Sequence, residues 1–564
     1  MKYSKDLGAD ELLEGLLNRA DSLGFIRAKK KTPILQWIDG LITSSGVPFN
    51  LKQHQFQRDV LEDESRVIVV RKAAQLGFSE VVTIRCLYGQ IMGRYQIGAL
   101  FLMPSQLDVA DFSRARFSPL ILNNPQKIGK FIEQTDAASI KRICQSTLYL
   151  RGGKSTWNIE NLKKSSSQLI SVPCDVLIVD EVDHHEQNML LLAKERLGHS
   201  LVRDEFYLGT PSIPGWGISE LYEKSDQKIW VIKCKSCNTE NHLEGDFPNC
   251  LEQLSNGNVV RACRNCHKEI FPHDGYWIAQ NPKSETSGYW VSQLNSVFTD
   301  LKELLNYYKN PPAAGLQEFY NSRLGVPWIP AENRITPQDV YVNCGPDFMG
   351  ANSQGPCCAG IDVGAVLHIV IARRLQEKQV EIVYLGRVSD WNELHNLCRN
   401  FGVQFVVIDA EPETRQCRSW QQSESFPIFL ADYNPNPLTA AIWNEESMTL
   451  KIGRTESLDM VHEHLTSPGK LILPSRNSEV DEYAKQCSSI CKVLEQDDLG
   501  NRTFKYRKTG PADHYAHATG YCLWAATKIP VAKDSYRNRE NLKSEIDFDP
   551  FAPNYGTRDN YPFD

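Results

Sequence analysis

The sequence predicts an α/β protein with two sheet-containing regions and a cysteine-rich insert between them. Between residues 65 and 215, short apolar runs such as VIVV (67–70) and DVLIVD (175–180) alternate with polar helical stretches. These runs are too short and too rich in β-branched residues for helices, and their alternation with helices indicates a parallel sheet. A second α/β region starts at CCAGIDVG (357–364) and ends with a helix at 511–527.

The chain has 564 residues, which corresponds to about three to four domains at roughly 150 residues each. The order of apolar, cysteine-rich and polar stretches predicts their boundaries. We expect an N-terminal helical segment (1–45), a first α/β domain (46–227), a cysteine-paired insert (228–280), a connector rich in Pro, Trp and Tyr (281–350), a second α/β domain (351–530) and a flexible C-terminal tail (531–564).

Composition excludes several classes of protein. Hydrophobic residues make up 41% and charged residues 23% of the chain, which is typical of a globular protein and excludes a disordered or collagen-like one. The net charge of −7 excludes a polycation that coats nucleic acid. No apolar run is long enough to span a membrane, and acidic residues near the N-terminus argue against a signal peptide. The 16 cysteines are then expected to be thiols and metal ligands in the cytosol.

A phosphate-binding loop is predicted at RKAAQLGFSE (71–80), between a strand and a helix. Such a loop needs backbone N–H groups and a helix N-terminus directed at the phosphates. The usual G-x-x-x-x-G-K-[ST] pattern is broken here, because its first glycine is absent and Phe78 stands where the lysine belongs. Lys72 at the strand end can replace that lysine, while Gly77 and Ser79 keep the turn and the Mg²⁺-binding hydroxyl.

Two carboxylates and a threonine complete the predicted nucleotide site. The apolar strand 176–179 runs into Asp180 and Glu181. In nucleotide hydrolysis, the first carboxylate holds the Mg²⁺ shell and the second polarises the attacking water. The strand EFYLGTPS (205–212) ends at Thr210, which is expected beside the γ-phosphate because ligands of an open parallel sheet lie at the carboxyl ends of its strands.

The insert contains two C-x-x-C pairs, separated by 25 residues between the second and third cysteines. Each pair can present two thiolates from a tight knuckle, and four thiolates form a closed tetrahedral Zn²⁺ site. Such a site leaves no position open for catalysis, so the predicted role is structural. The four predicted ligands are Cys234, Cys237, Cys263 and Cys266.

Three acids of the second α/β region form a predicted cluster. Asp362 and Asp409 each end an apolar strand, and Asp513 lies near the start of the last helix. This layout is that of a ribonuclease-H-like fold, in which converging carboxylates bind two divalent ions, Mg²⁺ or Mn²⁺, for phosphodiester hydrolysis. Glu411 or Glu413 could replace Asp409 as the second ligand.

Taken in order, these parts resemble the large terminase subunit of tailed bacteriophages of the lambda-type lineage. The resemblance covers roughly residues 35–530 and is carried by the phrases RKAAQLGFSE, LIVDEVD, LGTPS and EFYNSRLGVPW. It implies a RecA-like P-loop ATPase domain with a zinc-ribbon insert, followed by a ribonuclease-H-like endonuclease. The implied activity is ATP-driven packaging of DNA into a capsid, combined with cutting of concatemeric DNA.

The resemblance also assigns roles to residues and implies partners. Lys72 and Ser79 would bind phosphate and Mg²⁺, Asp180 would hold Mg²⁺, Glu181 would be catalytic, and Thr210 would couple hydrolysis to movement. The implied partners are double-stranded DNA, a portal protein, a small terminase subunit and further copies of the chain in a ring, in the cytoplasm of an infected bacterium and transiently at the capsid portal. The alternatives are a zinc-containing superfamily-2-like helicase without nuclease activity and a catalytically inactive DNA-binding protein.

Overall fold

The computed structural model describes most of the chain. The described ranges are 32–133, 138–153, 172–312, 315–353, 355–434, 441–496 and 502–532. Residues 1–31 of the expected N-terminal helical segment and almost all of the expected tail lie outside them. The described chain forms two compact units: the first runs to Val326 apart from Ile213–Trp216, and the second contains that segment and the residues from Pro327 onward.

The first unit is built on one eleven-stranded sheet, counted over the described residues. Its strand order is β12-β8-β13-β1-β7-β6-β2-β5-β4-β3, with β9 paired to β8. The sheet includes β2 (Gly98–Met103), β3 (Ile132–Glu133), β4 (Ile140–Ile143), β5 (Ser146–Gly152) and β9 (Glu240–Asn241). From β13 to β5 the neighbouring strands are parallel. The strands named most often below are β1 (Val67–Lys72), β6 (Val176–Val179), β7 (Asp204–Gly209) and β13 (Ser287–Val291).

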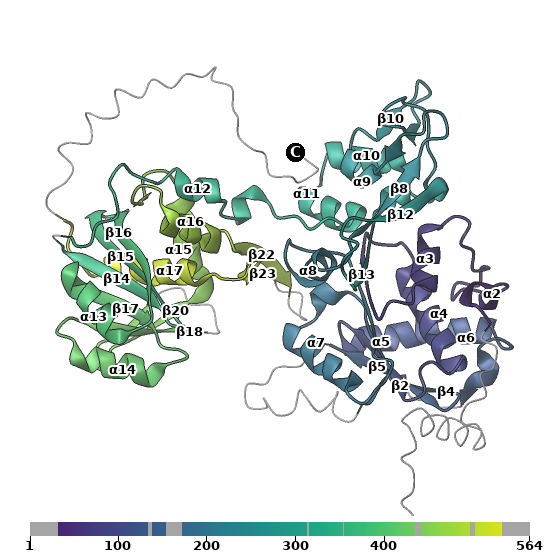
Figure 1. Ribbon diagram of the computed structural model, residues 1–564, viewed down its shortest axis with the longest axis horizontal. Helices are drawn as coiled ribbons and strands as arrows, with labels where there is room; N and C mark the ends of the chain where they lie inside the picture. The colour runs from purple at the N-terminus through teal and green to yellow at the C-terminus, as the bar shows by residue number, and fades with distance from the viewer. Residues whose placement is uncertain are drawn as a thin grey trace, which may run out of the picture. The chain divides into compact units, whose positions relative to one another are not determined.

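Buried apolar strands and covering helices explain this sheet. Each residue of β6, β7 and β13 is buried, as expected for parallel strands that are covered by helices on both faces. Helix α4 (Phe78–Ile91) follows β1 and helix α8 (Gly217–Glu223) follows β7, and Figure 1 shows them on opposite faces of the sheet. Right-handed crossovers that leave in opposite directions along the sheet place their helices in this way.

The insert and the expected connector contribute more to this sheet than the sequence indicated. Strands β8 (Lys228–Lys233) and β12 (Gly275–Ala279), at the two ends of the cysteine insert, pair with each other and extend the sheet. Strand β13 falls inside the expected connector, yet it lies between β8 and β1. Its sequence SGYWV contains Tyr, Trp and Val, which favour strands, and burial of all five residues in the sheet adds to this local propensity.

The second unit has an eight-stranded sheet of the described residues, in the order β19-β20-β18-β17-β14-β15-β16-β21. Strands β14 (Cys357–Asp362), β15 (Leu367–Gln376) and β16 (Gln379–Val388) are antiparallel neighbours. Strands β14, β17 (Val403–Asp409), β18 (Ile428–Asn434) and β20 (Thr449–Gly453) are parallel. Three antiparallel strands followed by parallel ones form the mixed sheet expected of a ribonuclease-H-like fold.

The last helix, α17 (His514–Ala526), lies very close to the central strand β14. A Cβ atom on Gly360 would stand 2.1 Å from the backbone of Ala518 and 2.1 Å from that of Cys522. Only glycine fits at such an approach of two backbones. Because side chains alternate along a strand, Asp362 lies on the same face of β14 as Gly360, which is the face that α17 covers.

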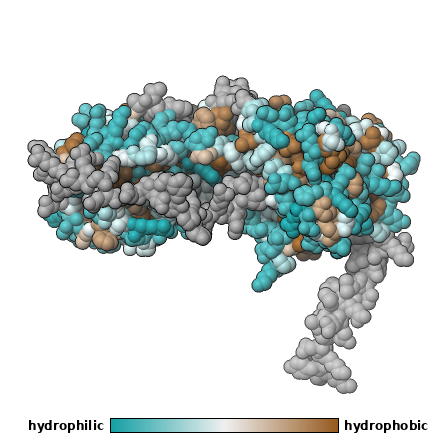
Figure 2. All heavy atoms as spheres, turned by 90° about the horizontal axis from the view of Figure 1, so that it is seen from above, coloured by the Kyte–Doolittle hydropathy of each residue, from teal (hydrophilic) through white to brown (hydrophobic). Residues whose placement is uncertain are grey.

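No helix of the described ranges has the length and apolar character needed to cross a membrane. The face of the molecule shown in Figure 2 is mostly hydrophilic, with hydrophobic side chains in separate patches.

Candidate active sites

The predicted phosphate loop joins β1 to α4, and a hydrogen bond from a glutamine side chain holds its backbone in place. Lys72 is the last residue of β1, and Gly77 adopts a φ of 76° immediately before α4. The side-chain amide of Gln57 donates a hydrogen bond of 2.7 Å to the Leu76 carbonyl. The loop therefore presents its backbone at the N-terminus of a 14-residue helix, which is the arrangement that binds phosphate.

Strand order brings the other predicted residues to this loop. Strand β7 lies between β1 and β6, so Thr210 at its end lies between Lys72 and Glu181. The Lys72 ammonium is 2.8 Å from Glu181 Oε1, and the Thr210 backbone N–H donates to Glu181 Oε2 at 3.1 Å. The structure thus brings three of the predicted residues into direct contact.

The charges of this site depend on one another. Burial alone would raise the pKa of Glu181, but the charge and hydrogen bond of Lys72 outweigh it and hold the pKa below its usual value. Burial raises the pKa of Asp180, against the charge of Lys72 and a hydrogen bond with Ser79. A buried carboxylate beside a hydroxyl group is a suitable place for Mg²⁺, whose own charge would favour the ionised form.

Asp183 is a site residue that the sequence reasoning missed. Its carboxylate accepts hydrogen bonds from the backbone N–H groups of Ser212 at 2.8 Å and Ile218 at 2.7 Å, and also from the Ser212 hydroxyl. It therefore connects the loop after β6 to the residues that follow Thr210 and to the start of α8. Asp183 lies two residues beyond Glu181 in LIVDEVD, and no local pattern revealed its role because its partners, at Ser212 and Ile218, are about 30 residues away in the chain.

The segment EFYNSRLGVPW forms a second support for the phosphate loop. The backbone N–H of Ala74 donates to the Ser322 carbonyl at 2.8 Å. Gly325 has a φ of 65°, and a Cβ there would stand 2.9 Å from the Ala73 nitrogen. The sequence suggested this segment only through resemblance, because its contacts with the loop span about 250 residues of chain.

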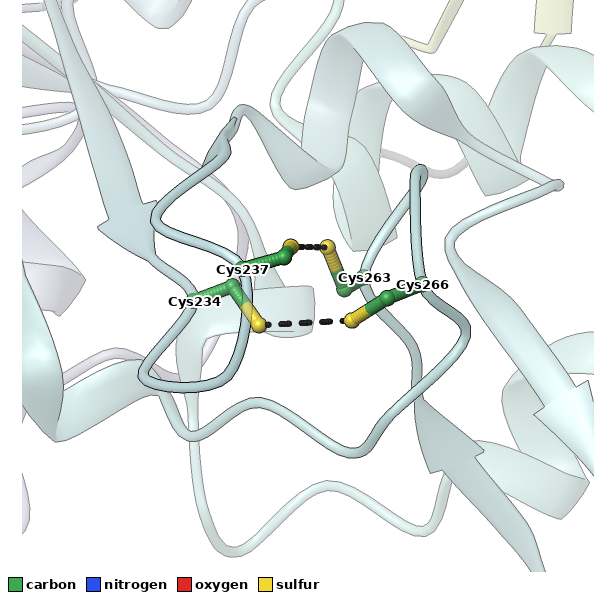
Figure 3. A group of neighbouring side chains, drawn as sticks. All are labelled: Cys234, Cys237, Cys263 and Cys266. Atoms are coloured by element: carbon green, nitrogen blue, oxygen red, sulfur yellow. Dashed lines mark hydrogen bonds between the residues drawn. The ribbon is translucent and has the colours of Figure 1, made fainter.

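The four cysteines of the insert lie together, as Figure 3 shows. The sulfur atoms of Cys234 and Cys266 are 3.6 Å apart, and those of Cys237 and Cys263 are 3.5 Å apart. In a tetrahedral zinc site with Zn–S distances near 2.3 Å, sulfur atoms are about 3.8 Å apart. Hydrogen bonds of Thr239 lower the pKa of Cys237, whereas the neighbouring thiols raise the pKa of Cys266, so the distances between the sulfur atoms are what supports the site. The residues therefore fit a tetrahedral thiolate site.

Two of the three predicted acids of the second unit lie on neighbouring strands. Ile361 and Ile408 are paired in the parallel register of β14 and β17, so Asp362 and Asp409 follow side by side. Burial raises the pKa of Asp409 to about 6, and the negative charge of Asp362 acts in the same direction. Glu411 and Glu413 are exposed beyond the strand end.

The third acid, Asp513, is held by cations instead. Its carboxylate lies 3.3 Å from the Lys508 ammonium, 3.3 Å from His517 Nε2 and 3.9 Å from the Arg454 guanidinium. Although burial opposes it, hydrogen bonds with His517 and Lys508 and their charges hold the pKa of Asp513 far below its usual range. Among the described residues, the one metal-type group of this unit contains Asp362 but neither Asp409 nor Asp513.

A protein-family model matches residues 52–286, and its description is phage terminase large subunit gpA, ATPase domain. The ATPase unit of this chain is that of a phage large terminase subunit. The matched range covers the phosphate loop, Asp180, Glu181, Thr210 and the cysteine insert. It confirms the family that the sequence resembles.

Three solved structures of large terminases are similar to the chain to different degrees. The large terminase of bacteriophage HK97 is similar with a TM-score of 0.50 and 12% identity, over 88% of this chain and 100% of that one. The large terminase of the thermophilic bacteriophage D6E in complex with ATP-gamma-S has a TM-score of 0.30 and 11% identity, over 84% and 98%. The large terminase nuclease of the thermophilic phage G20c has a TM-score of 0.23 and 14% identity, over 34% and 98%. No curated protein matches the chain.

The similarity to the HK97 large terminase supports the fold of both units, because the match extends over 88% of this chain. Together with the observed topology, it confirms an ATPase domain followed by a ribonuclease-H-like domain. The helicase alternative is not favoured, since the sheet of the second unit is mixed, with β14, β15 and β16 antiparallel, and is not a second RecA-like lobe.

Replacing Gly325 by alanine is expected to weaken ATP binding about tenfold, which corresponds to about 1.4 kcal/mol. The added Cβ would press against the Ala73 nitrogen and displace the phosphate loop. Equilibrium binding of a fluorescent ATP analogue measures the effect. Gly315→Ala is the matched control, because Gly315 has a similar φ of 72° with nothing within 4 Å of its Cβ position. Equal affinities of the two variants would contradict the supporting role of Gly325.

Proposed function

We propose that this large terminase subunit packages DNA with the ATP site around Lys72 and Glu181 and cuts DNA with the carboxylates around Asp362. The observation that carries the proposal is the position of both acid sets. Asp180 and Glu181 follow a parallel strand of the first sheet, and Asp362 and Asp409 end parallel strands of the second, with Asp513 at the start of α17. Each set is in contact with positively charged or imidazole side chains. Cations at these positions match an anionic substrate such as ATP or a DNA backbone.

In the ATP site, the Lys72 ammonium can pair with either of two anionic groups, the Glu181 carboxylate or the phosphates of a bound nucleotide. The ammonium pairs with Glu181, and the lysine side chain is 6% exposed. Phosphates bound on the loop would draw the ammonium toward them. Glu181 would then be free to polarise the attacking water. Ser79 and Asp180 would hold Mg²⁺, which neutralises the developing phosphate charge.

Hydrolysis would be sensed at Thr210. Its backbone N–H already binds the second oxygen of Glu181, so a movement of that carboxylate changes the end of β7. Asp183 joins the next residues to the start of α8. We propose that this hydrogen-bonded path transmits the loss of the γ-phosphate to the rest of the motor.

In the nuclease site, Asp362, Asp409 and Asp513 are proposed as the acids for two divalent ions, Mg²⁺ or Mn²⁺. The ions would activate water and stabilise the leaving oxygen of the phosphodiester. The parallel register supports Asp409 rather than Glu411 or Glu413 as the second acid. Lys508 and Arg454 now neutralise Asp513 and would turn toward the DNA phosphate once a metal ion takes their place.

DNA and the components of a packaging complex are the partners that the family implies. At finer detail, we propose that the chain works as a homo-oligomeric ring, with a portal protein and a small terminase subunit, in the cytoplasm of an infected bacterium and at the capsid portal. The family alone supports the proposal of these partners.

The cysteine cluster is proposed to hold one structural Zn²⁺. Along the chain its two knuckles lie between β8 and β12, which are neighbouring strands at one end of the sheet. Cross-linking the knuckles through a metal would stabilise an insert that has only a two-stranded sheet, β10 (Leu251–Gln253) with β11 (Val259–Arg261), of its own.

Lys72→Ala and Glu181→Gln are each expected to lower ATP hydrolysis by at least about a hundredfold, because one removes the phosphate contact and the other the water-polarising carboxylate. Metal-dependent cutting of plasmid DNA should remain within about twofold of wild type, since its acids belong to the other unit. Phosphate release and plasmid nicking measure the two activities.

The control for these variants is Asp409→Ala, which should reverse the pattern and retain ATP hydrolysis. A Glu181→Gln chain that hydrolyses ATP at the wild-type rate would contradict the assignment. A chain in which Asp409→Ala cuts normally but Glu411→Ala does not would move the second acid to Glu411.

The purified chain is expected to contain about one zinc ion per molecule, and Cys263→Ser should lose it and destabilise the insert. Elemental analysis measures the metal, and hydrogen exchange of β10 and β11 measures the insert. Cys250→Ser is the matched control, because Cys250 is buried in the same insert but bonds to the Leu243 carbonyl. Chelator-free protein without zinc, or Cys263→Ser protein with full zinc content, would contradict the site.

A further inference from the structure

Two histidines stand beside Asp362 in the second unit. His514 Nδ1 lies 2.7 Å from Asp362 Oδ2. The ring of His368 stacks on that of His514, with centroids 4.6 Å apart. Each of the three residues has one possible ligand atom that lies within 4.8 Å of those of the other two. Apart from the four cysteines, this is the one such group in the described ranges.

Three different elements hold these residues in place. His368 on β15 is the direct antiparallel partner of Asp362 on β14, and directly opposed residues of such strands bring their side chains together on one face. His514 begins α17, which Gly360 allows to approach β14. The central acid therefore has an imidazole on one neighbouring strand and the predicted acid Asp409 on the other.

The immediate surroundings favour a ligand role for His368. The residue is 7% exposed. Its ring has a hydrogen bond with the Val366 backbone, and its Nε2 atom lies 3.5 Å from the Gln486 amide nitrogen. An imidazole that binds a metal ion through one nitrogen is commonly oriented by such a contact of the other nitrogen. The His514 side chain is 40% exposed, so it has room to turn toward an ion that enters from solvent.

We propose that Asp362, His368 and His514 together bind one divalent transition-metal ion. The inference rests on the proposed nuclease and adds two imidazole ligands to a site for which the sequence predicted acids alone. Two imidazoles and a carboxylate form a ligand set for manganese, iron, cobalt or zinc, whereas Mg²⁺ prefers oxygen ligands throughout. The nuclease should accordingly bind Mn²⁺ more tightly than Mg²⁺.

The test uses Mn²⁺ as the probe, on the zinc-loaded full chain without nucleotide. Pulsed electron paramagnetic resonance detects nitrogen bound to Mn²⁺ through its ¹⁴N coupling. Wild-type protein should show this coupling and should lose it in the His368→Asn, His514→Ala double variant. Loss of His514 alone should weaken Mn²⁺ binding at least about tenfold, because even outer-shell partners of metal ligands change affinity by about 10- to 100-fold.

His395→Ala is the matched control, because His395 pairs with the carboxylate of Glu424 but has no second imidazole in a metal-type group. It should keep both the ¹⁴N coupling and the Mn²⁺ affinity. His514→Ala changes a partly exposed side chain, and hydrogen exchange of β14 and α17 at the wild-type level shows that the second unit of the variant is folded.

Two results would overturn the inference in different ways. Asp362-dependent Mn²⁺ binding without ¹⁴N coupling would mean that acids alone hold the ion, and the proposed nuclease would stand. Absence of any Asp362-dependent Mn²⁺ binding, together with absence of DNA cutting, would remove the proposed nuclease as well.

Discussion

Repulsion between carboxylates at the ends of parallel strands is the constraint on which both units depend. A buried acid stays ionised only beside a cation or hydrogen-bond donors. In the ATPase unit Lys72 meets this need for Glu181 at 2.8 Å. In the second unit Lys508, Arg454 and His517 surround Asp513, and His514 contacts Asp362. Each proposed catalytic acid of these pairs is therefore balanced in the absence of substrate.

This balance suggests how each site responds to its ligands. ATP brings negative charge, which competes with Glu181 for Lys72. Metal ions bring positive charge, which competes with Lys508 and Arg454 for Asp513 and leaves those side chains for a DNA phosphate. In both units, binding exchanges an internal ion pair for one with the ligand. Activity therefore needs the complete set of reactants, which suits an enzyme that must not cut DNA at random.

The sequence was most informative where chemistry lies in adjacent residues, as in Asp180-Glu181 and the two C-x-x-C pairs. Parallel strand order then explains why Lys72, Thr210 and Glu181 meet. The supports of the phosphate loop were not predictable, because Gln57 and Gly325 act through contacts with a distant backbone. Strand β13 was not predicted because its five residues are all buried and show no alternation of apolar and polar side chains. The ion pairs of Asp513 depend on how α15 (Arg454–Thr466) and β23 (Arg502–Lys508) pack, which no local pattern reveals.

The exchange of ion pairs in the ATPase unit is the central claim, and a crystal structure of the full chain with Mg²⁺ and a non-hydrolysable ATP analogue tests it most directly. The account predicts that the Lys72 ammonium leaves Glu181 and lies within hydrogen-bonding distance of the β- or γ-phosphate, with Glu181 facing a water molecule beside the γ-phosphate. A bound analogue with Lys72 still paired to Glu181 at about the present distance of 2.8 Å, and with another cation on the phosphates, would contradict it.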